Sequence, residues 1–454
     1  MQKLISLYEY STLKYRVCRN PADEGLDETI SVLLITEDSL QKLSKLIEDV
    51  SFLEIYHDRI RTLNYAGVAK IGTLKIEILP KFFREGDIDT AKPAIMRNLL
   101  YMLQYSDTLN FKEISNADLD EIKNDFLEVI VFLFSKNLAQ LLRNKQERQY
   151  IRYQEDLRFV REKIVTKKYG TNPARLHIIP CDYHERSINT LMNQTFRFTA
   201  QTLLNQVKSP ETYRHLKFII SVLDGVDPGR IFPSEIRKIQ FNRMNQVFRP
   251  YVKFCELFLS HSTITLQASK VDFFSLMIPM EKLFESFIAE MLRKYRHTIL
   301  PPGSAHNILS QYSLGSLAYE NGRGYFTMIP DIFLKGSPPI IIDTKYKLLT
   351  TEERKFKISQ ADLYQIYAYC RESGTRIAIL LYPAGINVEI PERVFTLGRE
   401  NLIELHIKTI SLEYDLSKEE GISSFVQALA EKFRFLHRDH DTQIIQNIEA
   451  SVVT

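Results

Sequence analysis

Short apolar runs alternate with helical patterns over residues 272–454. The runs Tyr325–Leu334 and Pro339–Lys345 flank a Lys-Gly-Ser-Pro turn, which predicts a β-hairpin. Apolar residues from Phe273 through Leu276 to Leu292 recur at helical spacing before it, and a helix over 360–371 and a buried strand over 376–381 follow it. A strand over 404–407 and a closing helix near 425–435 complete the pattern. The order of helix, strands, helix and strand predicts an α/β domain.

The first 90 residues predict a small strand-rich domain. A strand over 31–35 precedes a helix over 37–48, and strands follow over 52–56, 65–71 and 74–79. The spacing of Gly67 and Gly72 is close to that of a phosphate-binding loop. However, the Gly-Lys-Ser/Thr ending is missing and the glycines lie within a strand pair. We therefore expect this chain to bind no nucleotide itself.

Residues 91–271 predict a mainly helical region. Pro93 suits a first helical turn, and a second helix is expected over 121–143. The segment 143–175 holds ten basic against four acidic residues, with tyrosines between them. That pattern suits a polyphosphate backbone, although a solvated helix face explains it equally well. The candidate DNA-binding residues are Arg152, Arg158, Arg161, Lys163, Lys167 and Lys168.

Composition limits the classes of protein that remain open. At 454 residues the chain suggests two or three domains, and a net charge of only +3 means that any nucleic-acid surface must be local. The four cysteines are scattered, which argues against zinc and iron–sulfur sites. Asp182, His184 and Glu185 resemble a metal trio, but consecutive polar residues in a turn before a helix are more often caps. No signal peptide or membrane span is indicated, so a cytoplasmic protein is expected.

Acidic residues interrupt the hairpin where a core strand normally avoids them. Asp331 follows Pro330, and Asp343 and Lys345 leave the same face of the second strand. Burying these groups is costly unless they pair or hold a metal. Two carboxylates from adjacent strands can bind one Mg²⁺ ion, and a neighbouring lysine can orient the attacking water. The alternative is a structural Asp–Lys pair at a strand end.

Several short motifs then agree in order. Pro330-Asp331 with Asp343-Thr344-Lys345 resembles the PD-(D/E)xK nuclease motif, with Asp343 in place of the commoner Glu. Gln365-x-x-x-Tyr369 is similar to the Q-x-x-x-Y signature of the RecB-like branch, and residues 280–290 resemble its opening helix. With the segments 77–81, 181–193 and 241–250, the set resembles the McrC family, the nuclease subunits of McrBC modified-DNA restriction systems.

The resemblance implies an α/β multidomain fold. It has a β-rich partner-docking domain over 1–90, a mainly helical DNA-contact domain over 91–271 and a PD-(D/E)xK nuclease core over 272–454. It implies that Mg²⁺ binds Asp331, Asp343 and Glu285, and that Lys345 positions the attacking water. Gln365 would hold the carboxylates or the scissile phosphate, with Tyr369 packed beside it. Glu281 stays an alternative to Glu285, because a helical wheel places it nearer the apolar stripe.

The resemblance also implies a partner. This partner would be an McrB-like AAA+ ring that hydrolyses GTP and recognises modified cytosine in double-stranded DNA. The present chain would stimulate that hydrolysis and cut the DNA. Two other functions stay open: a non-catalytic activator with a decayed nuclease fold, and a stand-alone RecB-like repair nuclease that acts on free ends.

Overall fold

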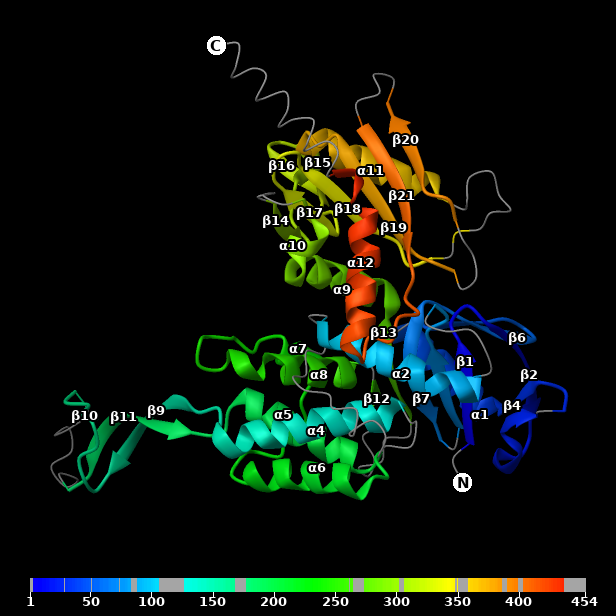
Figure 1. The fold of residues 1–454 in the computed structure, drawn as a ribbon. Helices are drawn as coiled ribbons and strands as arrows, with labels where there is room; N and C mark the ends of the chain where they lie inside the picture. The colour runs from blue at the N-terminus through cyan, green and yellow to red at the C-terminus, as the bar shows by residue number, and fades with distance from the viewer. Residues whose placement is uncertain are drawn as a thin grey trace, which may run out of the picture. The chain divides into compact units, whose positions relative to one another are not determined.

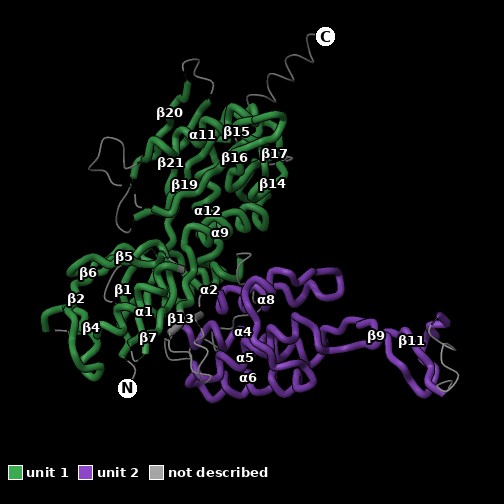
Figure 2. Tube along the Cα trace, turned by 180° about the vertical axis from the view of Figure 1, so that it is seen from behind, with its two compact units in different colours: residues 1–110, 114–126, 275–454 green, residues 111–113, 127–274 purple. Residues whose placement is uncertain are grey.

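The computed structural model describes residues 3–27, 29–49, 51–72, 74–82, 88–105, 126–167, 177–260, 262–263, 273–301, 306–347, 349, 358–385, 390–398 and 403–436. The chain forms two compact units, which Figure 2 shows in different colours. The first comprises residues 1–110, 114–126 and 275–454, and the second comprises residues 111–113 and 127–274. The three domain ranges expected from the sequence stay a prediction.

Two sheets form the N-terminal part of the first unit (Figure 1). In the first sheet, β1 runs parallel to β8, and β8 pairs antiparallel with β7, which neighbours β13. The second sheet has the order β3-β4-β2-β6-β5, and α1 packs on it. The strands predicted over 65–71 and 74–79 are confirmed as β7 and β8. The elements are β1 (Lys3–Tyr8), β2 (Thr12–Cys18), β3 (Gly25–Asp27), β4 (Val32–Thr36), α1 (Glu37–Asp49), β5 (Leu53–Ile55), β6 (Arg59–Thr62), β7 (Tyr65–Ile71), β8 (Leu74–Leu79) and β13 (Phe273–Pro279).

Helix α2 (Ile88–Tyr105) follows these sheets and carries a buried charge. Its Lys92 ammonium lies 2.5 Å from the Glu77 carboxylate of β8, and both side chains are almost fully buried. The Ser6 hydroxyl donates a 2.8 Å hydrogen bond to the same carboxylate. The prediction that Pro93 opens this helix was wrong, because the helix begins five residues earlier and contains the proline. The proline lacks an N–H, so the helix loses one backbone hydrogen bond there.

The second unit combines helices with a β-ribbon. Strand β9 pairs antiparallel with β11, and β11 pairs with the short β10. Figure 1 shows this ribbon extending away from the helices of the unit. The charged segment therefore forms strands over residues 149–157 and 163–164, and the alternative interpretation of it as a solvated helix face was wrong there. Tyr153 stacks on Tyr183 across the ribbon. The elements are α4 (Phe126–Asn144), β9 (Gln149–Leu157), β10 (Lys163–Ile164), β11 (Ile179–Ser187), α5 (Leu191–Leu204), α6 (Pro210–Val222), α7 (Pro233–Ile236), α8 (Arg249–Ser260) and β12 (Ser262–Thr263).

The C-terminal part of the first unit contains a six-stranded mixed sheet of order β14-β17-β18-β19-β21-β20. Strands β17 and β18 form the predicted hairpin, and β18, β19 and β21 run parallel. Helix α11 packs its Ile366 and Cys370 against Ile341 and Leu380 of the sheet. The elements are α9 (Met280–Lys294), α10 (Arg296–Ile299), β14 (Asn307–Ser310), β17 (Ile332–Lys335), β18 (Ile340–Thr344), α11 (Gln360–Ser373), β19 (Ile377–Pro383), β20 (Arg393–Leu397), β21 (Ile403–Ile410) and α12 (Glu419–Lys432).

Two of the expected elements differ from the sequence-based prediction. The run beginning at Tyr325 lies in β16 (Arg323–Met328), which pairs with β15 (Gly315–Glu320) in a separate two-stranded ribbon. Phe273 and Leu276 lie in β13, and the helix expected to include them begins at Met280. A continuous apolar run fits a buried strand as well as a helix, so spacing alone did not separate them. None of the described helices is long and apolar enough to cross a membrane.

The buried pair of Glu77 and Lys92 gives a stability prediction. Glu77→Leu leaves the Lys92 charge buried without its partner, so we expect the free energy of unfolding to fall by about 3–5 kcal/mol. Adding Lys92→Met removes the second charge and should recover most of this loss. Urea unfolding measures both changes. The exposed pair of Lys42 and Asp38 on α1 provides the control, because Asp38→Ala should cost less than about 1 kcal/mol. A Glu77→Leu loss no larger than this control would contradict the prediction.

Candidate active site

The hairpin brings two carboxyl groups together at one end of the mixed sheet. The pairing of Ile332 with Ile342 places Asp331 opposite Asp343. The Thr344 backbone N–H and hydroxyl each donate a 2.8 Å hydrogen bond to Asp331 Oδ2. Asp343 lies at the end of an apolar strand and is 1% exposed. The local sequence thus forces the second acid into the interior and leaves the first at the strand entrance.

Lys345 joins this pair from the residue position two beyond Asp343. Its Nζ atom lies 2.6 Å from Asp343 Oδ2. It also donates a 3.3 Å hydrogen bond to Gln365 Oε1 on α11. Gln365 Nε2 donates in turn to the Tyr369 hydroxyl at 2.7 Å, and that hydroxyl donates to the Ile329 backbone oxygen at 3.1 Å. Gln365 and Tyr369 lie four residues apart on α11 and therefore face the same side of the helix. Their hydrogen bonds connect Lys345 to the backbone just before Asp331.

Helix α9 supplies a third acid, Glu285. Its carboxylate accepts a hydrogen bond from Gln311. Burial raises the pKa of Glu285 to about 7, and repulsion from Asp331 and then Asp343 adds to the effect. Glu281 is exposed, and the residues whose pKa it affects are Tyr10 and Tyr65. Of the two glutamates that the sequence left open, the structure brings Glu285 near the aspartates.

The electrostatics of the cluster suit a bound cation. Burial is the largest cause of the raised pKa of Asp331, and burial followed by repulsion from Asp331 raises the pKa of Asp343 to about 7. Burial lowers the pKa of Lys345, but attraction to Asp343 outweighs it and the net pKa is raised. Beyond the ion pair, Asp343 Oδ2 has no hydrogen-bond partner among the described residues. These carboxylates would be stabilised in their charged form by a divalent cation.

Protein side chains alone do not complete a metal site here. Within the described ranges, no group of three or more His, Cys, Asp or Glu side chains is close enough to hold an ion. Mg²⁺ commonly takes one or two carboxylates and keeps several waters, so the aspartate pair fits that ion. Glu285 accepts its hydrogen bond from Gln311 beside this pair.

The predicted DNA-binding residues that the structure describes lie in the strands and loops of the β-ribbon of the second unit, in different settings. Arg152 Nε donates a 2.6 Å hydrogen bond to Asp182, so the charge of this arginine is already matched. The Arg161 guanidinium group lies over the Tyr183 ring, 4.1 Å from its centre, and 3.6 Å from the Glu185 carboxylate. The remaining candidates divide into Lys163 of β10, the exposed loop residues Arg158 and Lys167, and Lys168, which is outside the described residues.

The suspected trio of Asp182, His184 and Glu185 lies on strand β11 and not in a turn, which corrects the expected position. His184 Nδ1 lies 3.2 Å from Glu162, while the two acids contact the arginines of the ribbon. Each member therefore contacts a different residue of the ribbon.

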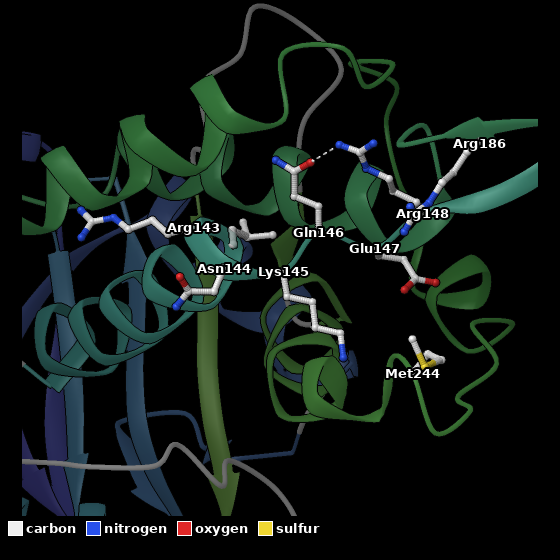
Figure 3. A pocket seen from close by; sticks show the side chains of 9 residues that line it. Arg143, Asn144, Lys145, Gln146, Glu147, Arg148, Arg186 and Met244 are labelled. Atoms are coloured by element: carbon white, nitrogen blue, oxygen red, sulfur yellow. Dashed lines mark hydrogen bonds between the residues drawn. The ribbon is translucent and has the colours of Figure 1, made fainter.

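The start of the charged segment lines a cavity of about 430 Å³ in the second unit. Arg143, Lys145, Arg148 and Arg186 contribute basic side chains to its wall. Figure 3 shows Arg143 pointing away from Arg148 and Arg186. Arg143 lies over the Phe218 ring at 4.8 Å. Arg143 is therefore not directed at the same point as Arg148 and Arg186.

Sequence reasoning missed two residues that organise the acidic cluster. Thr344 occupies the variable position of the Asp-x-Lys motif, yet it donates both hydrogen bonds that hold Asp331. Gln311 fixes Glu285 and has a positive φ of 51°. A hydroxyl between two motif residues was a weak signal for Thr344, whereas no sequence pattern indicated Gln311.

The chain matches the model of a family of restriction-system components. The family described as "McrBC 5-methylcytosine restriction system component" matches residues 60–383, and the chain belongs to this family. A chain in the structure "Refined half-complex from tetradecameric assembly of Thermococcus gammatolerans McrB AAA+ hexamers with bound McrC" has a similar fold. The TM-score is 0.60 at 19% identity, over 94% of this chain and 99% of that chain.

A second solved structure from the same organism is the "Cryo-EM structure of the Thermococcus gammatolerans McrBC complex". It matches 64% of this chain and 88% of that chain, with 22% identity and a TM-score of 0.49. No curated protein matches this chain in sequence.

The ribbon gives a prediction on DNA binding. If it contacts phosphates, Arg158→Ala and Lys167→Ala should each reduce the slope of log K against log salt concentration by about 1. Arg152→Ala should change the slope less, because Asp182 already neutralises that arginine. Fluorescence anisotropy with labelled duplex DNA at several salt concentrations measures the slopes. Unchanged slopes for both exposed residues would rule out the ribbon as a phosphate-binding surface.

Proposed function

We propose that this chain is the DNA-cutting subunit of a modified-cytosine restriction complex. The reaction is hydrolysis of a phosphodiester bond with Mg²⁺ as the cofactor. The observation that carries the proposal is the meeting of Asp331, Asp343 and Lys345 at one end of the hairpin, in the order of the PD-(D/E)xK motif. Gln365 and Tyr369 reach the same point from α11, as the Q-x-x-x-Y resemblance implies.

The donor set supports Mg²⁺ as the metal. Asp331 and Asp343 would hold the ion, and Glu285 would support it through water. When bound, Mg²⁺ supplies positive charge at the scissile phosphate and favours ionisation of the attacking water.

The chain's own side chains supply orientation and a fixed charge. Thr344 fixes Asp331, so that carboxylate needs no rearrangement before the reaction. The Lys345 ammonium, held between Asp343 and Gln365, donates hydrogen bonds to the attacking water or to the phosphate oxygens. Its raised pKa keeps it protonated, so it offsets negative charge and does not act as a base. Tyr369 holds the Gln365 amide in the orientation that presents its oxygen to the lysine.

The partner in this proposal is an McrB-like AAA+ ring that hydrolyses GTP. The proposal is supported by the family description and by the similar fold of a chain in a complex of McrB hexamers with bound McrC. The present chain stimulates GTP hydrolysis, and the partner recognises modified cytosine in double-stranded DNA.

Gly67, which begins the near-match to a phosphate-binding loop, lies inside β7. A Cβ atom added there would come within 2.0 Å of the Leu276 backbone oxygen. That glycine therefore permits the close approach of β7 to β13.

The first test removes one carboxylate. We expect Asp343→Ala to lower Mg²⁺-dependent cleavage by the assembled complex at least about 100-fold, since it removes charge stabilisation at the reacting centre. Stimulation of GTP hydrolysis should be unchanged, because the partner hydrolyses GTP and Asp343 takes no part in that reaction. Cleavage of methylated and unmodified DNA, with GTP hydrolysis measured in parallel, separates the two effects.

Three outcomes would contradict the proposed function. A folded Asp343→Ala protein that loses both activities would show that cutting and stimulation are not separate. A wild-type complex that stimulates GTP hydrolysis without cutting would indicate a non-catalytic activator. Cutting of free DNA ends without partner or nucleotide would indicate a stand-alone repair nuclease.

A matched pair tests the third acid. We expect Glu285→Gln to lower the cleavage rate and to raise the Mg²⁺ concentration for half-maximal cleavage, because the glutamine carries no charge toward the aspartates. Glu281→Gln, one turn earlier on α9 and exposed, should leave both quantities unchanged. A Mg²⁺ titration of cleavage measures the effect. Equal behaviour of the two variants would remove Glu285 from the site.

A further inference from the structure

Tyr346 follows Lys345 directly. Residues from the start of the chain form hydrogen bonds with both its side-chain hydroxyl and its backbone oxygen. Its hydroxyl donates a 2.7 Å hydrogen bond to Glu9 Oε1. The Tyr10 hydroxyl donates a 3.1 Å hydrogen bond to the Tyr346 backbone oxygen. The ring meets Phe82 edge-on at 4.8 Å between centroids, and the residue is 2% exposed. Packing alone needs only the ring, whereas the two hydrogen bonds fix its orientation and its peptide group.

Glu9 is itself held in place. Its backbone N–H donates to the Leu79 oxygen at 2.9 Å, and the Lys81 N–H donates to Glu9 Oε1 at 2.8 Å. Glu9 is fully buried, and burial raises its pKa to about 8. Its Oε1 atom accepts hydrogen bonds from both the Tyr346 hydroxyl and the Lys81 N–H, and burial disfavours the charged form of the carboxyl group.

The turn between β1 and β2 carries backbone strain at the next residue. Tyr10 has a φ of 59°, in the left-handed region that residues with side chains seldom adopt. The Ser11 hydroxyl closes the turn by donating to the Tyr8 backbone oxygen at 2.6 Å. Such conformations persist where the surroundings enforce them, and they concentrate at functional sites. Here the strained residue points its hydroxyl at the peptide next to Lys345.

The Lys345 backbone makes two hydrogen bonds of its own. Its oxygen accepts from the Lys347 N–H at 3.0 Å. Its N–H donates to the Leu381 oxygen at 2.9 Å, and β18 has already ended at Thr344. We propose that Glu9 and Tyr10 are positioning residues for Lys345, acting through Tyr346. This inference rests on the proposed nuclease function. Loss of either hydrogen bond would let the Tyr346 peptide turn and move the ammonium away from Asp343 and Gln365. The N-terminal part thus sets the geometry of a centre more than 330 positions later in the chain.

The test uses hydroxyl deletions in the full chain within its complex. Tyr346→Phe and Tyr10→Phe each remove one hydrogen bond and keep the ring. We expect each to lower the single-turnover cleavage rate about tenfold, because small misplacements of a reacting group are costly. DNA affinity and GTPase stimulation should stay unchanged. Tyr15→Phe is the matched control, since its hydroxyl bonds the Tyr56 oxygen in an exposed part of the same region.

Glu9 provides a conservative rescue. Glu9→Gln keeps an uncharged acceptor and should retain the wild-type rate, while Glu9→Ala should lower it to the level of Tyr346→Phe. Thermal melting of each variant checks that it is folded. If Glu9→Ala does not fold, the two tyrosine variants still decide the question. Cleavage rates of Tyr346→Phe and Tyr10→Phe equal to that of Tyr15→Phe would overturn the proposal. A loss of DNA affinity as large as the loss of cleavage rate in the two variants would also overturn it.

A second readout needs no cleavage. Amide hydrogen exchange of residues 343–347, measured on the metal-free chain, should become faster in Tyr346→Phe and Tyr10→Phe but not in Tyr15→Phe. Unchanged exchange would overturn the positioning role even if the complex cuts DNA. Conversely, a wild-type complex that does not cut would overturn the proposed nuclease function and, with it, any catalytic meaning of faster exchange.

Discussion

The burial of neighbouring carboxyl groups is the constraint on which the candidate site depends. Asp331 and Asp343 lie opposite each other on a two-stranded turn, and Glu285 approaches them from α9. Each has a raised pKa whose largest cause is burial. Such a cluster is unfavourable unless positive charge enters it. Lys345 supplies one such charge, and the chemistry of the donors suits a divalent cation for the rest.

The surrounding fold holds this unfavourable cluster in place. An apolar strand, Ile340–Ile342, forces the next residue into the interior, and the parallel neighbour β19 pairs with it along its length. Helix α11 adds a hydrogen-bonded path from Lys345 through Gln365 to Tyr369. The stability of the sheet and helix core therefore offsets the electrostatic cost at its end, as functional sites commonly require.

The N-terminal sheets take part in the same arrangement. Glu9 and Tyr10 contact Tyr346, and Phe82 and Phe284 pack around its ring. These contacts lie within one compact unit that contains both ends of the described chain. The region that the sequence predicts as a partner-docking domain thus contacts the residue that follows Lys345.

The sequence by itself determined the elements whose signals are local. Strands β7 and β8, the β17–β18 hairpin and α11 follow from apolar runs and turn residues, and the motif order indicated Asp331, Asp343 and Lys345 as candidates. Only the tertiary structure separated Glu285 from Glu281, because both fit one helical pattern and their difference lies in what faces them. It also decided that β9 to β11 form a ribbon and that Glu9 reaches Tyr346. Those outcomes depend on contacts between distant residues, and no local pattern records such contacts.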